Sequence, residues 1–404
     1  MVLLVNNYVN DQIQVLYHKN IENKQFAKNG VVLDAIATGK ILRTIIDEIN
    51  STLNITVQRV VLTLPSHSLM IYQSQAMLDF KDANHVITNY DCSKVIEMVK
   101  NIIIDSNQVI CLTKPYTFKV DTFNAGAQLP IGIKGQIIHV NALVYALPKV
   151  LYNSQLAVLA YAQCDLLTMT LDQFALACNV NNNDMNNHVV IVDWNLDYTK
   201  VSIFNNSVLY ASTTIKIGWN QIVESVMTQM RCGYDKAEKY LQKIINISSN
   251  YLSDVIIDKF IDEHTKLVVG LTKSDLQTTV KKRINEIIDC IEYFLNQVSN
   301  NNSAEMQVIF TGATLRISGF VAYIKNYSKL KNIKYMLNQN PGAYSYLWAT
   351  LIGVTHYQHL VNVFSSNFIS SIMSLNTLPK INHNIQKKRE TKYYNSFLQK
   401  KLSV

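Results

Sequence analysis

Two segments of the sequence have residue types and spacings that suit contact with a phosphate group or a metal ion. Asp193 and Asp197 follow the apolar run 189–192, and two carboxylates at the end of a buried strand can hold a cation or polarise a water molecule. Thr311-Gly312-Ala313-Thr314 follows a second apolar run, 307–310, and precedes a helical pattern. A strand, a turn of small residues and a helix bring backbone N–H groups to a helix start, where they meet phosphate or ribose.

These segments also have purely structural interpretations. Asp193 and Asp197 suit a hydrogen-bonded hairpin, and the Thr-Gly-Ala-Thr segment suits a tight turn between a strand and a helix. His67 lies between two serines without an identifiable partner acid or nucleophile, so we expect a surface histidine. The six cysteines are far apart and form no CxxC pair, which disfavours a zinc site. The sequence therefore predicts no catalytic residue and no metal site.

Hydrophobic periodicity places these residues in two halves that begin alike. Leu3–Val5 and Ile13–Tyr17 form a predicted strand pair, and the segment 188–212 repeats strand, turn and strand. Two halves that each begin with such a hairpin indicate an internally duplicated fold. The Asn-rich segment 179–187 is the predicted boundary between the halves, since such clusters form loops.

Composition and charge indicate a folded chain of two to four subdomains. The 404 residues are 48% hydrophobic with only 12 Gly and 6 Pro. The net charge is +8, but residues 380–404 alone carry +6, so the body offers no basic groove and we predict no nucleic-acid partner. Residues 342–379 contain no charged side chain, yet polar residues interrupt them throughout. We expect a buried helix and a polar linker there rather than a transmembrane helix.

The last residues have the pattern of a basic amphipathic helix. At about 100° per residue, an apolar half of the helix separates from a polar half that includes Lys392 and Lys400. Lys401 falls in the apolar arc, where its long stem lets the charge reach lipid headgroups. Such a helix binds an anionic membrane surface weakly. A solvated tail without a membrane role is the alternative. The predicted membrane-binding residues are Lys392, Tyr393, Tyr394, Phe397, Leu398, Lys400, Lys401 and Leu402.

Taken together, these segments resemble the actin, sugar-kinase and heat-shock-protein fold, and within it the FtsA family. Residues 191–199 keep the Asp and the final Thr of the family's second phosphate hairpin but none of its glycines. Residues 217–222 resemble a Val-Gly-Gly segment that opens a helix and retain Gly218. Residues 231–241 resemble the nucleoside-flanking helix, with Glu238 matched and Leu241 at the lysine position. Residues 309–314 resemble the adenosine motif with one glycine of three.

Two features favour FtsA over other actins. The segment 66–144 is a strand-helix-strand module placed soon after the first helices, where FtsA carries its inserted subdomain, and the chain ends in a linker and a basic amphipathic helix. The resemblance implies an α/β, actin-like (RNase H-like) two-domain fold with an FtsA-type inserted subdomain. Its predicted parts are domain 1A at 1–64 and 145–186, closed by 343–360; the inserted subdomain 1C at 65–144; domain 2 at 187–342, with 2B at about 220–300; a linker at 361–386; and the membrane-targeting helix at 387–404.

The resemblance also implies ATP as the cofactor, but the sequence argues against ordinary Mg²⁺-ATP binding. The first hairpin has Asn7 in place of an Asp and Val9 in place of a Gly, and Leu196 and Asp197 put bulk and negative charge against the phosphates. We therefore expect weak or lost hydrolysis. The implied cofactor-binding residues are Asn7, Asn10, Asp193, Asn195, Thr199, Gly218, Glu238, Thr311, Gly312, Ala313 and Thr314.

The function that the resemblance implies is a cell-division scaffold at the cytoplasmic face of the membrane. It would bind the C-terminal peptide of FtsZ on its second domain, self-associate into filaments and attach peripherally to anionic lipid at the septum. Several tails on one filament would bind by avidity. One alternative is a PilM-like pilus or secretion scaffold, which the amphipathic tail disfavours. The other is an active ATPase or kinase of the actin superfamily, which the missing phosphate glycines disfavour.

Overall fold

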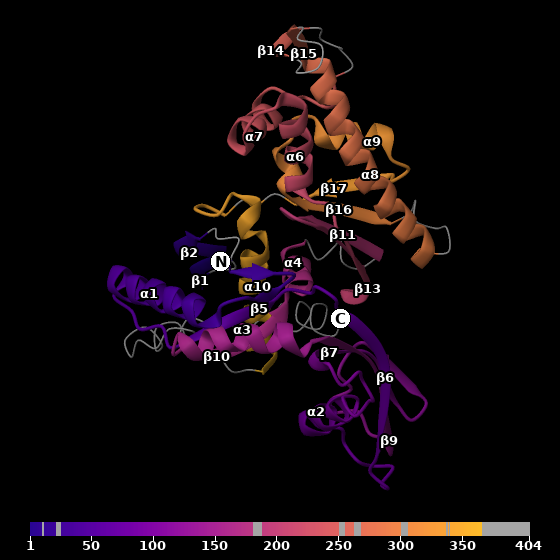
Figure 1. The fold of residues 1–404 in the computed structure, drawn as a ribbon. Helices are drawn as coiled ribbons and strands as arrows, with labels where there is room; N and C mark the ends of the chain where they lie inside the picture. Colours follow the sequence, from indigo (N-terminus) through magenta and orange to yellow (C-terminus); the bar gives the residue numbers. More distant parts are fainter. Residues whose placement is uncertain are drawn as a thin grey trace.

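The structure is a computed structural model that describes residues 1–9, 12–21, 26–180, 188–249, 255–261, 268–299, 306–336, 338 and 340–365. It has two lobes and an inserted module (Figure 1): the first lobe comprises residues up to 64, 149–180 and 340–365, the module lies between residues 64 and 149, and the second lobe comprises residues 188–336. The predicted tail helix, 387–404, and most of the predicted linker lie outside the described residues. In the described part of the chain, no helix is long and apolar enough to cross a membrane.

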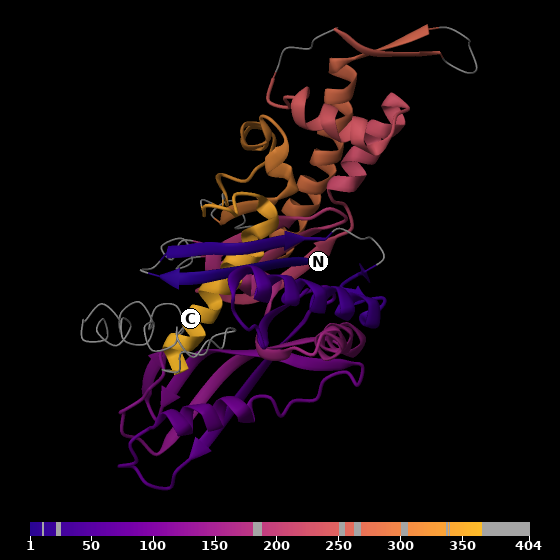
Figure 2. The ribbon, with the colours of Figure 1, turned by 90° about the vertical axis from the view of Figure 1, so that its left-hand side faces the viewer.

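The first lobe is built from three pairs of strands, the short pair β3–β4 among them, and the helices that cover them. Strands β1 and β2 form the predicted antiparallel hairpin, and β5 and β10 pair in parallel. Figure 2 shows α10 running beside the β1–β2 hairpin. The elements are β1 (Val2–Val9), β2 (Gln12–Asn20), β3 (Ala27–Lys28), β4 (Val31–Val32), α1 (Ala35–Leu53), β5 (Arg59–Leu64), α3 (Lys149–Tyr161), β10 (Asp165–Leu171), α4 (Asp172–Asn179), η3 (Tyr346–Trp348) and α10 (Ala349–Ser365).

A compact module is inserted between β5 and α3 and lies at the foot of the molecule in Figure 1. Its antiparallel sheet has the strand order β6-β9-β7-β8 and a buried core that includes Phe118. The sequence pattern predicts its helix at 93–104, but the helix begins at Asn89 because Thr88 and Asp91 form a capping box. The elements are β6 (Met70–Asp79), α2 (Asn89–Met98), β7 (Gln108–Val120), β8 (Phe123–Gly126) and β9 (Ile137–Pro148).

The second lobe is a five-stranded sheet, ordered β13-β12-β11-β16-β17, with helices packed on it. Helix α8 places Val280, Ile284 and Ile287 in the core at helical spacing, all fully buried. The hairpin β14–β15 projects from the outer end of the lobe (Figure 2). The elements are β11 (His188–Trp194), β12 (Thr199–Asn205), β13 (Val208–Ile215), α6 (Trp219–Met230), α7 (Tyr234–Lys243), β14 (Ile256–Ile261), β15 (Val268–Thr272), α8 (Lys273–Ser299), β16 (Gln307–Gly312), η2 (Ala313–Arg316), α9 (Phe320–Tyr327) and β17 (Asn332–Tyr335).

One hydrophobic cluster spans the junction between the lobes. It joins buried residues of the first lobe and of strand β9 to residues of β11–β13. The rings of Tyr145, Phe174 and Phe204 meet edge to face, with centroids 5.1 and 5.8 Å apart. The Tyr145 hydroxyl donates a hydrogen bond to the carbonyl of Leu209 at 2.7 Å. The two lobes therefore share a buried, apolar interface.

Candidate functional site

A cleft of about 530 Å³ lies where the second lobe faces the chain that leads into α10. Of the residues predicted from the sequence, Glu238 lines this cleft directly, and Leu196 lines it as the bulky residue expected beside the phosphates. The lining residues are Leu196, Tyr234, Glu238, Leu315, Arg316, Met336, Asn338, Tyr344, Ser345, Tyr346 and Leu347.

Arg316 engages Glu238, the carboxylate that the resemblance to FtsA implies would flank a nucleoside. The guanidinium Nη1 of Arg316 is 3.1 Å from Oε1 of Glu238, and the same oxygen accepts a hydrogen bond from the indole N–H of Trp219 at 3.1 Å. The guanidinium carbon lies 5.0 Å from the Trp219 ring centroid and 5.9 Å from that of Tyr346. These distances allow cation–π attraction to both rings. Glu238 and Arg316 therefore form an ion pair in the wall of the cleft.

The first N–H groups of helix α6 donate hydrogen bonds to other groups of the same chain. The N–H groups of Trp219 and Asn220 donate to the carbonyls of Asn195 and Leu196, at 3.0 and 2.7 Å. The Gly218 N–H donates to the Gln221 side chain at 2.7 Å. The N–H groups at a helix start are those that ordinarily bind phosphate. In this structure they close the turn of the second hairpin instead.

Gly218 is required by this close packing. A Cβ atom at Gly218 would lie 2.5 Å from the backbone nitrogen of Tyr198 and 2.6 Å from the carbonyl oxygen of Leu196. The side-chain amide of Asn220 also donates to the Asp197 carboxylate at 2.7 Å. The predicted residues Gly218 and Asp197 therefore hold the hairpin turn against α6.

The other predicted residues of the second hairpin also have partners within the chain. Burial raises the pKa of the Asp193 carboxyl to about 6, and the Asn195 amide donates to this carboxyl at 2.8 Å. The hydroxyl of Thr199 is buried and donates to the carbonyl of Ile217 at 2.8 Å. These contacts match the structural interpretation of the hairpin.

A buried ion pair beside this hairpin was not predicted from the sequence. The Nζ of Lys200, which is fully buried, lies 2.7 Å from Oδ2 of Asp172 at the start of α4. Oδ1 of Asp172 accepts hydrogen bonds from the N–H and the hydroxyl of Ser66, at 3.1 and 2.5 Å. Asp172 directly follows strand β10, whose last two residues are buried, so it could have been recognised from the sequence as an acidic residue at a strand end, as Asp193 was.

His67 is partly buried rather than fully exposed. Its ring lies 6.1 Å from the Tyr198 ring, and its buried Nδ1 has no hydrogen-bond partner among the described residues. Burial lowers the pKa of His67, and the nearby charges of Lys200 and Lys216 lower it further. The turn after β5 carries His67 toward the second hairpin, a long-range contact that local sequence does not reveal.

The Thr-Gly-Ala-Thr segment packs against strand β11. Gly312 has φ +99°, and a Cβ atom there would lie 2.2 Å from the carbonyl oxygen of Trp194. Thr311 and Ala313 are buried, and the Thr311 hydroxyl has no hydrogen-bond partner. The side chain of Thr314 lies outside the described residues. Close packing of two strands is sufficient to explain the glycine.

The first hairpin contributes little to the cleft as described. Asn7 pairs with Gln14 across β1 and β2, and Asn10 lies outside the described residues. The neighbouring Asn6 amide donates to the hydroxyl of Thr355 on α10 at 2.7 Å. Tyr8 stacks on His359 of the same helix, with ring centroids 4.1 Å apart. These contacts attach the hairpin to α10.

These contacts do not fit a bound magnesium triphosphate. The helix N–H groups that would face phosphate bind Asn195 and Leu196, and the carboxylate of Asp172 is paired with a lysine. Among the described residues, there is no group of three or more His, Cys, Asp or Glu side chains suited to a metal ion. The cleft beside Tyr234 and Tyr346 still has the volume for a planar group.

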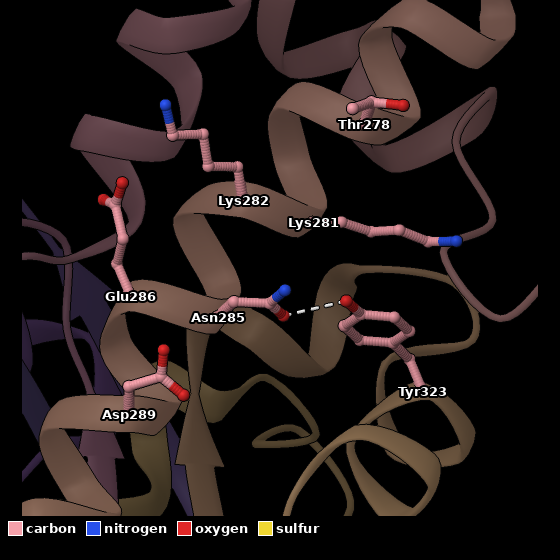
Figure 3. Close-up of a pocket in the computed structure, with 7 residues that line it drawn as sticks. All are labelled: Thr278, Lys281, Lys282, Asn285, Glu286, Asp289 and Tyr323. Carbon is pink, nitrogen blue, oxygen red and sulfur yellow. Dashed lines mark hydrogen bonds between the residues drawn. The ribbon is translucent and has the colours of Figure 1, made fainter.

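A second hollow of about 440 Å³ lies along α8 on the outside of the second lobe. Figure 3 shows its residues along α8, with Tyr323 of α9 beside them. The Tyr323 hydroxyl donates to the Asn285 side chain at 2.8 Å, and the Lys281 Nζ lies 5.3 Å from the Tyr323 ring centroid. The hollow therefore offers basic side chains, acidic side chains and one aromatic ring for contact with a peptide. The lining residues are Thr278, Lys281, Lys282, Asn285, Glu286, Asp289 and Tyr323.

The chain is similar in sequence to parts of known proteins. Residues 67–146 match the model of the SHS2 domain inserted in FtsA, two residues later at each end than the insert predicted at 65–144. Cell division protein FtsA of Bacillus subtilis (strain 168) is 17% identical over 290 residues, which are 72% of this chain and 66% of that protein. The match thus spans just under two thirds of the relative's length.

Solved structures share the fold at low sequence identity. One is a PilM-PilN type IV pilus biogenesis complex, with TM-score 0.57, 11% identity and coverage of 87% of this chain and 95% of that chain. Another is MreB5 of Spiroplasma citri bound to ADP, with TM-score 0.51, 12% identity and coverage of 89% and 83%. The predicted actin-like fold with an FtsA-type insert and the predicted resemblance to FtsA are confirmed.

Proposed function

From an actin-like chain that carries the SHS2 domain inserted in FtsA, we propose a cell-division scaffold that links FtsZ filaments to the inner face of the cytoplasmic membrane. It self-associates at the division site, and its ATP hydrolysis is weak or lost. The observation that carries this proposal is the contrast between the FtsA-type insert, which matches over residues 67–146, and the start of helix α6, whose N–H groups donate to Asn195 and Leu196 of the same chain.

The hollow along α8 is the surface that we propose for the C-terminal peptide of FtsZ. It lies on the second lobe, where the resemblance to FtsA puts this partner. Lys281 and Lys282 are adjacent on α8 and can attract acidic groups of a peptide, while Tyr323 offers an apolar face to its side chains. Hot spots in such interfaces are typically aromatic or cationic residues.

A peptide-binding experiment tests this partner. Fluorescence anisotropy would follow a labelled C-terminal peptide of the FtsZ from the same cell as the purified chain is added. We expect the Lys281→Glu/Lys282→Glu variant to weaken binding at least tenfold. The matched control is Lys94→Glu/Lys119→Glu, which makes the same change in net charge on the inserted module and leaves the affinity unchanged. Equal binding by both variants would refute the α8 surface.

The membrane attachment that we propose rests on the sequence of the tail. Apolar residues such as Phe397 and Leu402 would enter the interface, and lysines would meet anionic headgroups. Sedimentation with vesicles of phosphatidylglycerol and phosphatidylcholine measures this directly. We expect Phe397→Ser/Leu402→Ser to abolish binding and Ser396→Ala to leave it intact. Equal sedimentation of all three proteins would argue for a solvated tail.

A PilM-like pilus or secretion scaffold is the second candidate function. It is favoured by the similarity to the PilM-PilN complex, which covers 95% of that chain. The two candidate functions differ in the partner that the chain binds. If the chain does not bind the FtsZ peptide but binds a pilus-assembly component, that result supports the second function. An active ATPase or kinase is disfavoured because the helix start and the Asp172 carboxylate are already engaged.

A further inference from the structure

Two buried polar contacts cross the junction between the lobes. Lys200 on β12 of the second lobe is paired with Asp172 on α4 of the first lobe, at 2.7 Å. Two residues along the same strand, the hydroxyl of Ser202 donates to the Gln173 side chain at 2.8 Å. Lys200, Ser202 and Gln173 are all fully buried. The same pair of elements is therefore joined twice, by side chains that are fully buried except for Asp172, whose side chain is 15% exposed.

The partners of Asp172 fix the position of the lysine charge. A buried ammonium is costly unless an acid and further hydrogen bonds satisfy it and its partner. Oδ2 of Asp172 faces Lys200, while Oδ1 accepts from Ser66 and from the Gln173 N–H at 2.8 Å. Groups of the first lobe therefore fix the orientation of this carboxylate, and its other oxygen pairs with Lys200 of the second lobe. This arrangement defines one relative position of β12 and α4.

The apolar surroundings support the same arrangement. Domains in one chain move relative to each other by default unless their interface is large and hydrophobic. In this protein the cluster that contains Phe174, Phe204 and Tyr145 continues from one lobe into the other. The ion pair is therefore embedded in a shared core rather than placed across an open hinge.

We propose that Lys200 and Asp172 form a clamp that replaces nucleotide and metal ion as the group holding the lobes in one arrangement. The lysine supplies the positive charge at the junction, and the second hairpin is already closed on α6 by Asn195 and Leu196. The scaffold is then assembly-competent without a bound nucleotide. The assembly step rests on the proposed function, whereas the clamp itself concerns the lobes alone and does not depend on the identity of the partner peptide.

Hydrogen–deuterium exchange on the full chain tests the clamp. In the wild-type protein without nucleotide, we expect amides of α4 and β12 to exchange as slowly as those of β9 in the inserted module. Lys200→Met should speed exchange in α4 and β12 at least tenfold and leave β6 unchanged. Lys200→Arg keeps the charge and should retain most of the protection. Lys216→Met, an exposed lysine of the same lobe, is the matched control and should behave as wild type.

The outcomes separate the clamp from a simple loss of stability. If Lys200→Met speeds exchange equally in α4, β12 and β6, or in none of them, the clamp is refuted. If that variant does not fold, wild-type protein decides: the small-angle X-ray scattering profile should be the same with and without Mg²⁺-ATP, while α4 and β12 stay protected without nucleotide. A profile that contracts with Mg²⁺-ATP, or unprotected α4 and β12 amides, would overturn the proposal.

Discussion

The inserted module and the cleft between the lobes resemble FtsA to different degrees. The module keeps a complete sheet, a capped helix and its own core, and it matches the FtsA-type SHS2 domain over residues 67–146. At the cleft, Glu238 is paired with Arg316, and the first N–H groups of the neighbouring helix α6 donate to the carbonyls of Asn195 and Leu196. This contrast is the reason that we propose a scaffold rather than an enzyme of rapid turnover.

The three tryptophans make this comparison measurable. Trp194, Trp219 and Trp348 all lie in the lobes, and none lies in the module. Tryptophan fluorescence therefore reports on the lobes alone, while far-ultraviolet circular dichroism reports on the whole chain. Variants in the two regions can be told apart by which signal moves.

The largest expected effect on stability comes from truncating a large side chain in the core of the module. Phe118 is fully buried there, so Phe118→Ala should reduce the free energy of unfolding of the module by about 3–5 kcal/mol. In urea, circular dichroism should then show an early transition that tryptophan fluorescence does not follow. If both signals shift together, the module and the lobes unfold as one unit and the contrast between them fails.

Gly312→Ala should have the next largest effect, and in the lobes. An alanine there would be strained by the positive φ and would come too close to the Trp194 carbonyl, so the free energy of unfolding should fall by about 2–4 kcal/mol. The unfolding transition followed by tryptophan fluorescence should then occur at a lower urea concentration. The control is Gly342→Ala, at φ +83° where a Cβ atom would make only ordinary contact with Val15 at 3.4 Å, so that only the backbone preference is lost. Equal shifts at the two glycines would show that packing on β11 is not the reason for Gly312.

Asp193→Asn should stabilise the protein at neutral pH. The folded-state pKa of about 6 exceeds the ordinary value of 3.8, so the folded protein holds this proton more tightly than the unfolded chain does. Ionised Asp193 thus lowers stability above pH 6, and this cost disappears as the pH falls toward 4. We expect a gain of about 1–3 kcal/mol at pH 7 and none at pH 4, measured by urea unfolding.

Exposed Asp165→Asn is the control for this pH dependence and should change stability little at either pH. A loss of stability in Asp193→Asn at pH 7 would mean that the ionised carboxylate is needed in the hairpin. The carboxylate would then be a candidate for ligand contact again.

The smallest effect on stability should come from Arg316→Ala. The Arg316 and Glu238 side chains are 30% and 25% exposed, so their ion pair should contribute about 0–1 kcal/mol. Removing the guanidinium should nevertheless free Glu238 and the face of Trp219 for an adenine ring. We expect adenosine affinity to increase severalfold in equilibrium dialysis. An unchanged or lower affinity would show that Arg316 does not occupy the ligand's position.

The sequence predicted the features that depend on local pattern. The two hairpins, the inserted module and the strand-to-helix turn at Gly312 follow from apolar periodicity and small-residue turns. The start of α2 was misplaced by four residues because the capping box at Thr88 was not recognised. The predicted involvement of Glu238 in the cleft followed from the resemblance, and its engagement by Arg316 did not.

The contacts that could not be predicted connect residues far apart in the chain. Asp172 and Lys200 are paired across the junction between the lobes, and His67 lies beside Tyr198. Each residue has an ordinary local context, and their relation becomes visible only when β5, α4 and β12 are placed together. Side chains that fill a ligand site are hard to recognise from sequence for the same reason.

Isothermal titration calorimetry of the full chain with ATP and with adenosine, each with and without Mg²⁺, tests the central claim most directly. Protein free of co-purified nucleotide should bind ATP no more tightly than adenosine, and Mg²⁺ should make no difference, because the phosphate-facing groups are engaged within the chain. Micromolar ATP binding that needs Mg²⁺ and exceeds adenosine affinity tenfold or more would contradict the account and favour a nucleotide-controlled filament.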